Sequence, residues 1–216
     1  MAASLDLERL FQTVGESLGQ NRERLNLADA ENGNHGDHML EIFQVAAQAA
    51  RERSGDLAGA MDYAGRLLRR YPENGSAQVY ARGLEQFALE FRNRNITLDE
   101  LAPYVQGILA DKQEQNRVEP ATRSGEVLKA LLAGLAGWQQ AETGQAQAGK
   151  GLDMGYLFDL GVSYMQAKQR GGSKAEVIAD AAASASPLSS VPHRYVSGKM
   201  AIQALLEAMA AAAGAG

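Results

Sequence analysis

The chain contains no cysteine, which excludes a disulfide framework and a thiolate metal site and favours a cytoplasmic location. It also lacks any stretch approaching the roughly 18 apolar residues of a membrane span. Its first residues, MAASLDLERLFQTV, place acids among the apolar residues, unlike a secretion signal. We therefore expect a soluble protein with no membrane partner.

The chain also lacks a large excess of either acidic or basic residues. The formal net charge is −5, from 26 acidic and 21 basic residues that are interspersed along the chain. A nucleic-acid-binding protein neutralises phosphates with a concentrated basic stripe, and this chain has none. We therefore expect no nucleic-acid partner.

Helical patterning dominates the 216 residues, of which 45% are hydrophobic. Apolar residues recur at spacings of three and four, and beta signals are sparse, so the sequence predicts an all-α fold. One domain spanning residues 1–216 is the simpler reading, although length alone leaves two domains open. The expected helices cover about 5–25, 38–53, 56–71, 77–93, a segment from Thr97, a segment from Val127, 153–170, a short segment after Ser173, and 198–212.

Local signals set several boundaries in this scheme. Thr97 with Glu100, and Ser173 with Glu176, have the spacing of a helix N-terminal cap. The segment 184–197 contains Pro187 and Pro192, so we expect it to be irregular. Residues 142–151 are rich in Gly, Gln and Ala, which is typical of a mobile connection.

Small polar loops precede several of these helices. They occupy residues 26–37, 73–77 and 120–125. A loop that opens a helix directs backbone N–H groups and the positive end of the helix dipole into one space, which favours phosphate. Each loop taken alone is equally typical of an ordinary helix cap, so their order along the chain carries the functional information.

The first two loops resemble those of the ATP-binding family of dihydroxyacetone kinases, which includes the related fatty-acid kinases. That family has an Asp-Gly-Asp-(His or Thr)-Gly loop running into Asn-Met, and the matching residues here are Asn32-Gly33-Asn34-His35-Gly36-Asp37-His38-Met39. Asn26 matches an upstream asparagine of the fatty-acid-kinase branch. The family's Gly-Gly-Ala-Ser-Gly turn is similar to Asn74-Gly75-Ser76-Ala77-Gln78.

Two further motifs follow in the family's order. Glu-Pro-Gly-Asp-x-Thr-Met-Leu is similar to residues 119–128, which include Thr122, Arg123 and Ser124. Ala-Ser-Tyr-Leu followed by Gly-His-x-Asp-Pro-Gly is similar to residues 185–188 and then 192–198, which include His193, Ser197 and Gly198. The four motifs span nearly the whole chain, but residues 140–184 do not align with the family.

The resemblance implies an antiparallel barrel of about eight helices that binds ATP or ADP with magnesium at one end. The residues implied to contact nucleotide are Asn32, Asn34, His35, Asn74, Gly75, Ser76, Thr122, Arg123, Ser124, His193, Ser197 and Gly198. By resemblance His35 faces the phosphates, and Arg123, which the family lacks, is a candidate to neutralise phosphate in place of a metal ion. The resemblance also implies a dimer.

The metal-binding aspartates of the family are replaced here by Asn32 and Asn34. Magnesium prefers anionic oxygen, and an asparagine offers one neutral carbonyl oxygen. Thr122 and Tyr195 stand at two other aspartate positions of the family. Asp29 and Asp37 are candidates to supply the missing carboxylates, and Asp37 is equally typical of a helix N-cap.

The three histidines have alternative roles. His35 and His38, with Asp37, have ligand types that suit zinc or another transition metal, but a loop histidine bonded to neighbouring backbone is the simpler reading. For His193, in an expected proline-flanked loop, we expect a surface or packing role. The sequence assigns no catalytic residue.

Three functions stay open at this point. The first is a divergent member of the family that binds a nucleotide or another phosphorylated small molecule and has weak or no kinase activity. The second is an active ATP-dependent phosphotransferase subunit, with a partner subunit presenting dihydroxyacetone or a similar substrate. The third is a structural or regulatory domain whose loop end recognises a protein.

Overall fold

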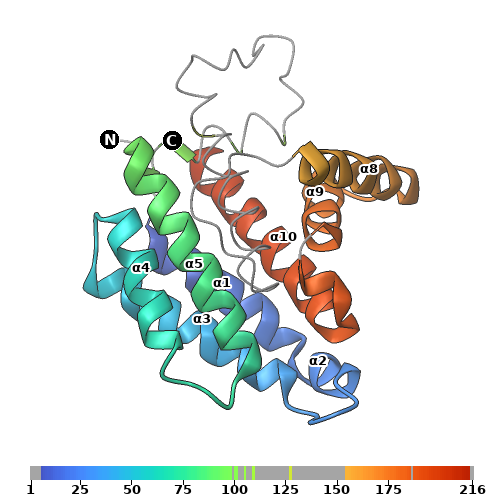
Figure 1. Ribbon diagram of the computed structural model, residues 1–216, viewed down its shortest axis with the longest axis horizontal. Helices are drawn as coiled ribbons and strands as arrows, with labels where there is room; N and C mark the ends of the chain where they lie inside the picture. The colour runs from blue at the N-terminus through green and yellow to red at the C-terminus, as the bar shows by residue number, and fades with distance from the viewer. Residues whose placement is uncertain are drawn as a thin grey trace.

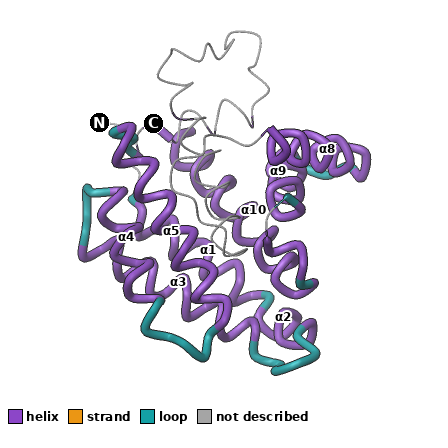
Figure 2. Tube along the Cα trace, in the orientation of Figure 1, coloured by secondary structure: helices purple, strands orange, loops and turns teal. Residues whose placement is uncertain are grey.

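The computed structural model describes residues 6–98, 100, 101, 105, 109, 127, 154–185 and 187–214. The described residues are helical, with no strand among them (Figures 1 and 2), so the expected all-α class is confirmed. The helices are α1 (Leu7–Gln20), α2 (Arg22–Ala28), α3 (His35–Glu52), α4 (Leu57–Leu68), α5 (Gly75–Arg94), α8 (Met154–Arg170), α9 (Lys174–Ser184), the 3₁₀ turn η2 (Pro187–Ser190) and α10 (Pro192–Gly214).

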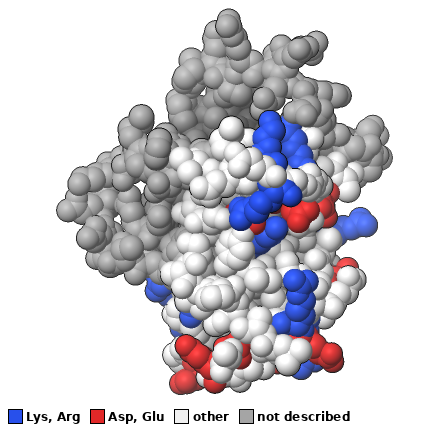
Figure 3. Space-filling model, turned by 90° about the vertical axis from the view of Figure 1, so that its right-hand side faces the viewer, with Lys and Arg blue, Asp and Glu red and all other residues white. Residues whose placement is uncertain are grey.

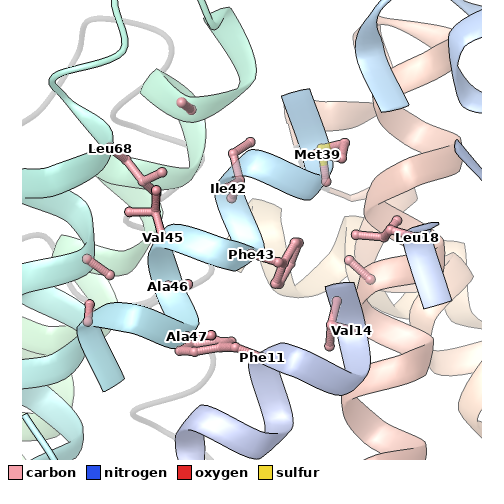
Figure 4. Packing of buried hydrophobic residues seen from close by; sticks show 14 of the residues in the cluster. Phe11, Val14, Leu18, Met39, Ile42, Phe43, Val45, Ala46, Ala47 and Leu68 are labelled. Atoms are coloured by element: carbon pink, nitrogen blue, oxygen red, sulfur yellow. The ribbon is translucent and has the colours of Figure 1, made fainter. Parts of the chain in front are cut away.

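The central helix of the bundle is α3, which packs between α1 and α4. In Figure 4 Phe43 points toward Val14 and Leu18 of α1, while Ile42 and Val45 lie toward Leu68 of α4. Alanines at three- and four-residue spacing let α3 approach its neighbours closely. This core fixes α3 in place, and with it the histidine at its first position.

The pair α8 and α9 lies to one side of the bundle, next to α10 (Figure 1). α9 packs on both α8 and α10, and α10 in turn packs on α1. Most buried residues of α9 are alanines: Ala175, Ala179, Ala181, Ala182 and Ala183. The described part of α8 and α9 is therefore joined to the bundle chiefly through α10.

Two of the expected caps are present. The carboxylate of Glu100 accepts hydrogen bonds from the backbone N–H and the hydroxyl of Thr97, at 2.9 and 3.0 Å. The hydroxyl of Ser173 accepts from the backbone N–H of Glu176 at 3.1 Å. Both sequence patterns therefore identified the beginning of a helix correctly.

Two expected boundaries were wrong. The helix expected over 5–25 is interrupted at Asn21, whose backbone N–H bonds to Leu18 and whose side chain donates to Ser17. The segment 184–197 is mostly helical, because α9 continues to Ser184 and α10 begins at Pro192. Proline is favourable at the first position of a helix, where its missing N–H has no intrahelical partner.

Some expectations fall outside the described residues. They are the turn at 120–125 with Thr122, Arg123 and Ser124, the helix from Val127 onwards apart from Val127 itself, and the connection at 142–151. Within the described residues, every helix is too short or too polar to cross a membrane.

Candidate functional site

Three helices begin close together at one end of the bundle. The loops before α3 and α5 lie at the same end in Figure 2, next to the start of α10. His35 is the first residue of α3, Ser76 belongs to the first turn of α5, and Ser197 to the second turn of α10. We refer to this region, formed by His35, Asn74, Gly75, Ser76, His193, Arg194 and Ser197, as the helix junction.

His35 lies at the centre of the helix junction. Its ring is within hydrogen-bonding distance of Ser197 Oγ through Nε2 (2.7 Å) and of Ser76 Oγ through Nδ1 (3.5 Å). The ring of His193 packs against it with a centroid separation of 4.5 Å. Burial, and then the electrostatic influence of the neighbouring His193 ring, lower the pKa of His35 to about 4. His35 is therefore neutral at pH 7.

The hydrogen-bond network selects one tautomer of His35. The hydroxyl of Ser197 donates to the backbone carbonyl of Arg194 at 3.1 Å, as a helical serine often does. Because that proton is committed, the 2.7 Å contact requires His35 Nε2–H to donate to Ser197 Oγ. His35 does not act as a base toward Ser197, so this pair is not an activated nucleophile.

Asn74 acts as the cap of α5. Its side-chain oxygen accepts from the N–H of Ala77 at 2.9 Å. Its side-chain nitrogen donates to the carbonyl of His38 (3.2 Å) and to Glu41 Oε2 (2.9 Å), which ties the start of α5 to α3. The capping role of Asn74 is therefore observed, and both its polar atoms are engaged within the protein.

Gly75 and Arg194 lie in close contact. A Cβ atom at Gly75 would lie 3.1 Å from Arg194 Nη2, so the absence of a side chain makes room for the guanidinium beside the start of α5. Arg194 is itself in the first turn of α10. Its positive charge also contributes to the lowered pKa of His35, after burial and the larger effect of His193. One cation thus lies near the beginnings of three helices.

Asp29 lies at the edge of the helix junction. Its Oδ1 accepts from the backbone N–H groups of Glu31 (3.2 Å) and Asn32 (3.3 Å) and lies 3.9 Å from His193 Nδ1. Burial acts to raise the pKa of Asp29, but the backbone hydrogen bonds and the electrostatic influence of the nearby His193 outweigh it, so the pKa is lowered. Asp29 holds the loop that precedes α3.

Asp37 does not cap α3, although the sequence suggested that it might supply the N-cap. The N-cap position is Asn34, whose side chain makes no capping bond and whose Oδ1 is buried without a hydrogen-bond partner. The cap comes from α2: Asn26 Oδ1 accepts from the N–H of Gly36 (2.7 Å) and of Asp37 (3.3 Å). Asp37 is in the first turn and accepts from Asn26 Nδ2.

The candidate magnesium ligands do not fit a two-metal site. Asp37 is bonded to Asn26 and forms an ion pair with Arg22 at 2.5 Å, while Asp29 is bonded to its own loop. Asn32 and Asn34 bring no negative charge. Among the described residues, no group of three or more His, Asp or Glu side chains is arranged to hold a metal ion. The geometry does not support His35 and His38 as zinc ligands either, because both ring nitrogens of His35 face serine hydroxyls.

Three of the four motifs supply residues to the helix junction. His193 and Ser197 of the last motif lie against His35, so of the two expected roles of His193, surface or packing, the structure shows packing. His193 belongs to α10, which corrects the expected loop. Gly198 is buried on α10, and Asn32 is exposed in the loop. Arg194 was missed from the sequence because the segment around it was expected to be irregular rather than a helix start.

Comparison with protein-family models, with curated proteins and with solved structures found no match to this chain. The functional interpretation of the helix junction therefore depends on its residues and their geometry.

Proposed function

We propose that this chain binds a nucleotide or another phosphorylated small molecule at the helix junction, without metal-dependent phosphoryl transfer. The observation that carries the proposal is the meeting of three helix N-termini around His35, next to Arg194. Helix N-termini attract anions through their dipoles and through first-turn N–H groups that carry no cap. In α3 and α5 the side chains of Asn26 and Asn74 already accept some of these N–H groups, so the dipoles and Arg194 carry the attraction.

The charges of the first turns support an anionic ligand. A cation near a helix N-terminus is unfavourable, because the dipole already places partial positive charge there. Arg194 nevertheless occupies the first turn of α10 and reaches the start of α5. The first turns of α5 and α10 contain no acidic residue, which is also true of α4 and α8, while the first turn of α3 contains Asp37. A bound phosphate would interact favourably with the guanidinium of Arg194 and with the dipoles of these helices.

Two carboxylates oppose an anion in this region, Glu41, which accepts from Asn74 Nδ2 at 2.9 Å, and Asp29. The carboxylate of Asp29 lies beside His193, which separates it from His35, and it already accepts two backbone N–H groups. The favoured position for phosphate is therefore beside Arg194 Nη2, where the guanidinium lies next to Gly75. Arginine suits this role because its guanidinium makes paired hydrogen bonds to phosphate oxygens.

Binding is favoured over catalysis because the described residues do not reproduce the acidic metal site of the kinases that the sequence resembles. Phosphoryl transfer depends chiefly on positioning and on neutralising charge, which metal ions supply in kinases. Here Asp29 and Asp37 are engaged in separate hydrogen-bond networks. A partner kinase subunit and self-association are expectations of the resemblance alone.

The test is calorimetric titration with ATP, ADP and inorganic phosphate, in EDTA and then with magnesium. We expect ATP or ADP to bind in EDTA, and Arg194→Gln to weaken binding at least about tenfold, since a charge-assisted hydrogen bond contributes about 1.5–3 kcal/mol. Arg66→Gln is the matched control, because Arg66 is an exposed arginine of α4 that pairs with Asp62.

Two results would contradict the proposal. Binding that requires magnesium, with turnover in the presence of dihydroxyacetone, would favour an active phosphotransferase subunit. No binding of any of the three ligands would favour an interaction domain. The Asn32→Asp/Asn34→Asp double variant separates these cases further: magnesium-dependent binding gained only in that variant would show that the loop lost its metal ligands.

A further inference from the structure

Asp180 of α9 is a buried carboxylate that connects three helices. Its side chain is 8% exposed and accepts hydrogen bonds from Arg170 of α8 and from the hydroxyl of Tyr195 of α10. Lys199 of α10 lies 3.3 Å from the same carboxylate and 3.4 Å from Glu176 Oε1. We call these four residues, Asp180, Arg170, Tyr195 and Lys199, the Asp180 cluster.

The carboxylate of Asp180 is ionised at neutral pH. Burial acts to raise its pKa, but the hydrogen bonds from Tyr195 and Lys199 and the nearby positive charges outweigh burial and lower it. Basic and acidic side chains lie side by side on the face of the molecule formed by α8, α9 and α10 (Figure 3). The cluster is therefore a charged contact with directional bonds, set at the edge of the bundle.

The start of α10 has different contacts on different faces. His193 and Ser197 face His35 of α3, and Arg194 reaches Gly75 of α5. Tyr195 and Lys199 face Asp180. Because successive helical residues are about 100° apart, residues 193 and 197 lie roughly opposite residue 195. The first two turns of α10 are thus held between the helix junction on one side and the Asp180 cluster on the other.

Alanine packing alone does not fix how α10 is rotated. The buried surface of α9 is largely alanine, so it offers few large side chains to interlock with α10. Hydrogen bonds have preferred directions, and a buried charge must keep its partners to avoid the cost of being left unpaired. The bonds from Tyr195 and Lys199 to Asp180 therefore add a directional constraint on the rotation of α10 to the packing of Val196 and Met200 against the core.

We propose that Asp180 is a positioning residue for the helix junction. Through Tyr195 and Lys199 it holds α10 in the rotation that presents His193 and Ser197 to His35, and Arg194 to Gly75. Its effect on ligand affinity rests on the proposed function, whereas its effect on the geometry of the junction does not. Removing the Asp180 cluster disturbs the site from the face of α10 opposite His35.

The experiment compares Asp180→Asn and Tyr195→Phe with Glu85→Gln in the full chain. Glu85→Gln is the matched control because it breaks the ion pair between Arg69 and Glu85, away from α10. For each variant, we would measure the thermal midpoint, the affinity for ATP in EDTA, and the imidazole nitrogen chemical shifts at pH 7. The chain has only three histidines, so the His35 and His193 signals are readily assigned.

We expect Asp180→Asn to shift the His35 and His193 signals and to weaken ATP binding at least tenfold. Tyr195→Phe keeps the ring and the ion pairs, so its effects have the same direction and are smaller, and it decides the question if Asp180→Asn does not fold. Glu85→Gln lowers the thermal midpoint but leaves the histidine signals and the affinity as in the parent chain.

A purely structural role would give a lower thermal midpoint with unchanged histidine signals and unchanged affinity, which overturns the proposal. Histidine signals that move while the affinity stays constant would also overturn it, because the junction would then bind without this rotation of α10. If the parent chain binds no phosphorylated ligand, the proposed function fails, and the histidine signals alone still show whether Asp180 positions α10.

Discussion

His35 Nε2 lies 2.7 Å from Ser197 Oγ, so a hydrogen bond joins two residues separated by 162 positions in the chain. Both side chains are buried, with exposed fractions of 3% and 1%. A buried hydrogen bond of this kind contributes little when intact but is costly to break, because the remaining partner loses its water as well. This bond therefore links the stability of the bundle to the integrity of the helix junction.

Ser197→Ala removes the acceptor of His35 Nε2–H and leaves a buried donor without its partner. We expect the free energy of unfolding to fall by about 1–3 kcal/mol, measured by urea denaturation. Ser17→Ala, at a half-buried position of α1, is the control and is expected to change it by less than about 0.5 kcal/mol. Equal effects of Ser197→Ala and Ser17→Ala would mean that the hydrogen bond between His35 and Ser197 does not contribute to the free energy of unfolding.

The lowered pKa of His35 predicts a pH dependence of stability. The pKa of His35 in the folded chain is about 4, below its ordinary value of 6.5, so between these two values the unfolded chain binds a proton at His35 and the folded chain does not. The stabilisation from neutral His35 is complete above pH 6.5 and is lost as pH falls toward 4. Its upper limit is about 3 kcal/mol.

The measurement is the urea midpoint between pH 8 and pH 4.5, in the parent chain and in His35→Gln. We expect the parent to lose stability across this window and His35→Gln to lose much less. The aspartates with lowered pKa values, Asp29, Asp37 and Asp180, lose their contribution below pH 4, outside the window. The exposed Glu52, whose pKa is lowered from an ordinary value of 4.5, loses its contribution below the lower edge of the window in both proteins alike. A parallel decline in both proteins would assign the effect to other groups.

Helix positions were largely accessible from the sequence, because apolar spacing and caps are local signals. The caps at Thr97 and Ser173 were identified by spacing alone. The start of α10 was not predicted from the sequence, since Pro192 is compatible both with a loop and with the first turn of a helix. The packing of His193 and Ser197 against α3 is what distinguishes a helix start at Pro192 from a loop.

The contacts of the helix junction were less accessible, because they join residues distant in sequence. Order along the chain grouped the first, second and fourth loops, and His35 does contact Ser76 and Ser197. Local patterns did not reveal that Asn26, rather than Asp37, caps α3, because that cap crosses from another helix. They also did not reveal the partner of Tyr195, because Asp180 belongs to an alanine-rich helix with no motif around it.

Gly36 is required by the close approach of α2 and α3. A Cβ atom there would collide with the backbone of Arg22 and lie 2.9 Å from Asn26 Oδ1. We expect Gly36→Ala to lower the free energy of unfolding by about 1–3 kcal/mol, as overpacking does. Gly15→Ala is the matched control: its Cβ would lie 3.6 Å from Phe43 Cβ, an ordinary contact, so the better helix former should stabilise α1 by about 0.5–1 kcal/mol.

The prediction is tested by measuring, in thermal or urea unfolding, whether Gly36→Ala lowers and Gly15→Ala raises the free energy of unfolding. Destabilisation by both alanines would indicate that α1 is packed more tightly around Gly15 than its contacts imply. Stabilisation by both would show that α2 moves away from α3 at little cost, and the cap from Asn26 would then be weak as well.

Asn26 and Asp37 form a second hydrogen-bonded pair, in which the amide and the carboxylate can be exchanged by mutation. Asn26 Nδ2 donates to Asp37 Oδ2 at 2.9 Å, while Asn26 Oδ1 accepts the helix N–H groups. Asn26→Asp keeps the acceptor and places two carboxylates in contact, which raises the pKa of the pair in the folded chain. We expect a loss of about 1–3 kcal/mol at pH 7, by comparison with the cost of a broken charged hydrogen bond.

A group whose folded pKa is raised contributes its stability at low pH and loses it as pH rises through that pKa. The deficit of Asn26→Asp relative to the parent chain should therefore shrink between pH 7 and pH 5, when measured by urea unfolding. Asn26→Asp/Asp37→Asn exchanges the two groups and restores one donor and one acceptor, so we expect it to recover most of the loss at pH 7. A double variant no more stable than Asn26→Asp would show that Asp37 acts mainly through Arg22, which lies 2.5 Å from its other oxygen, and not through Asn26.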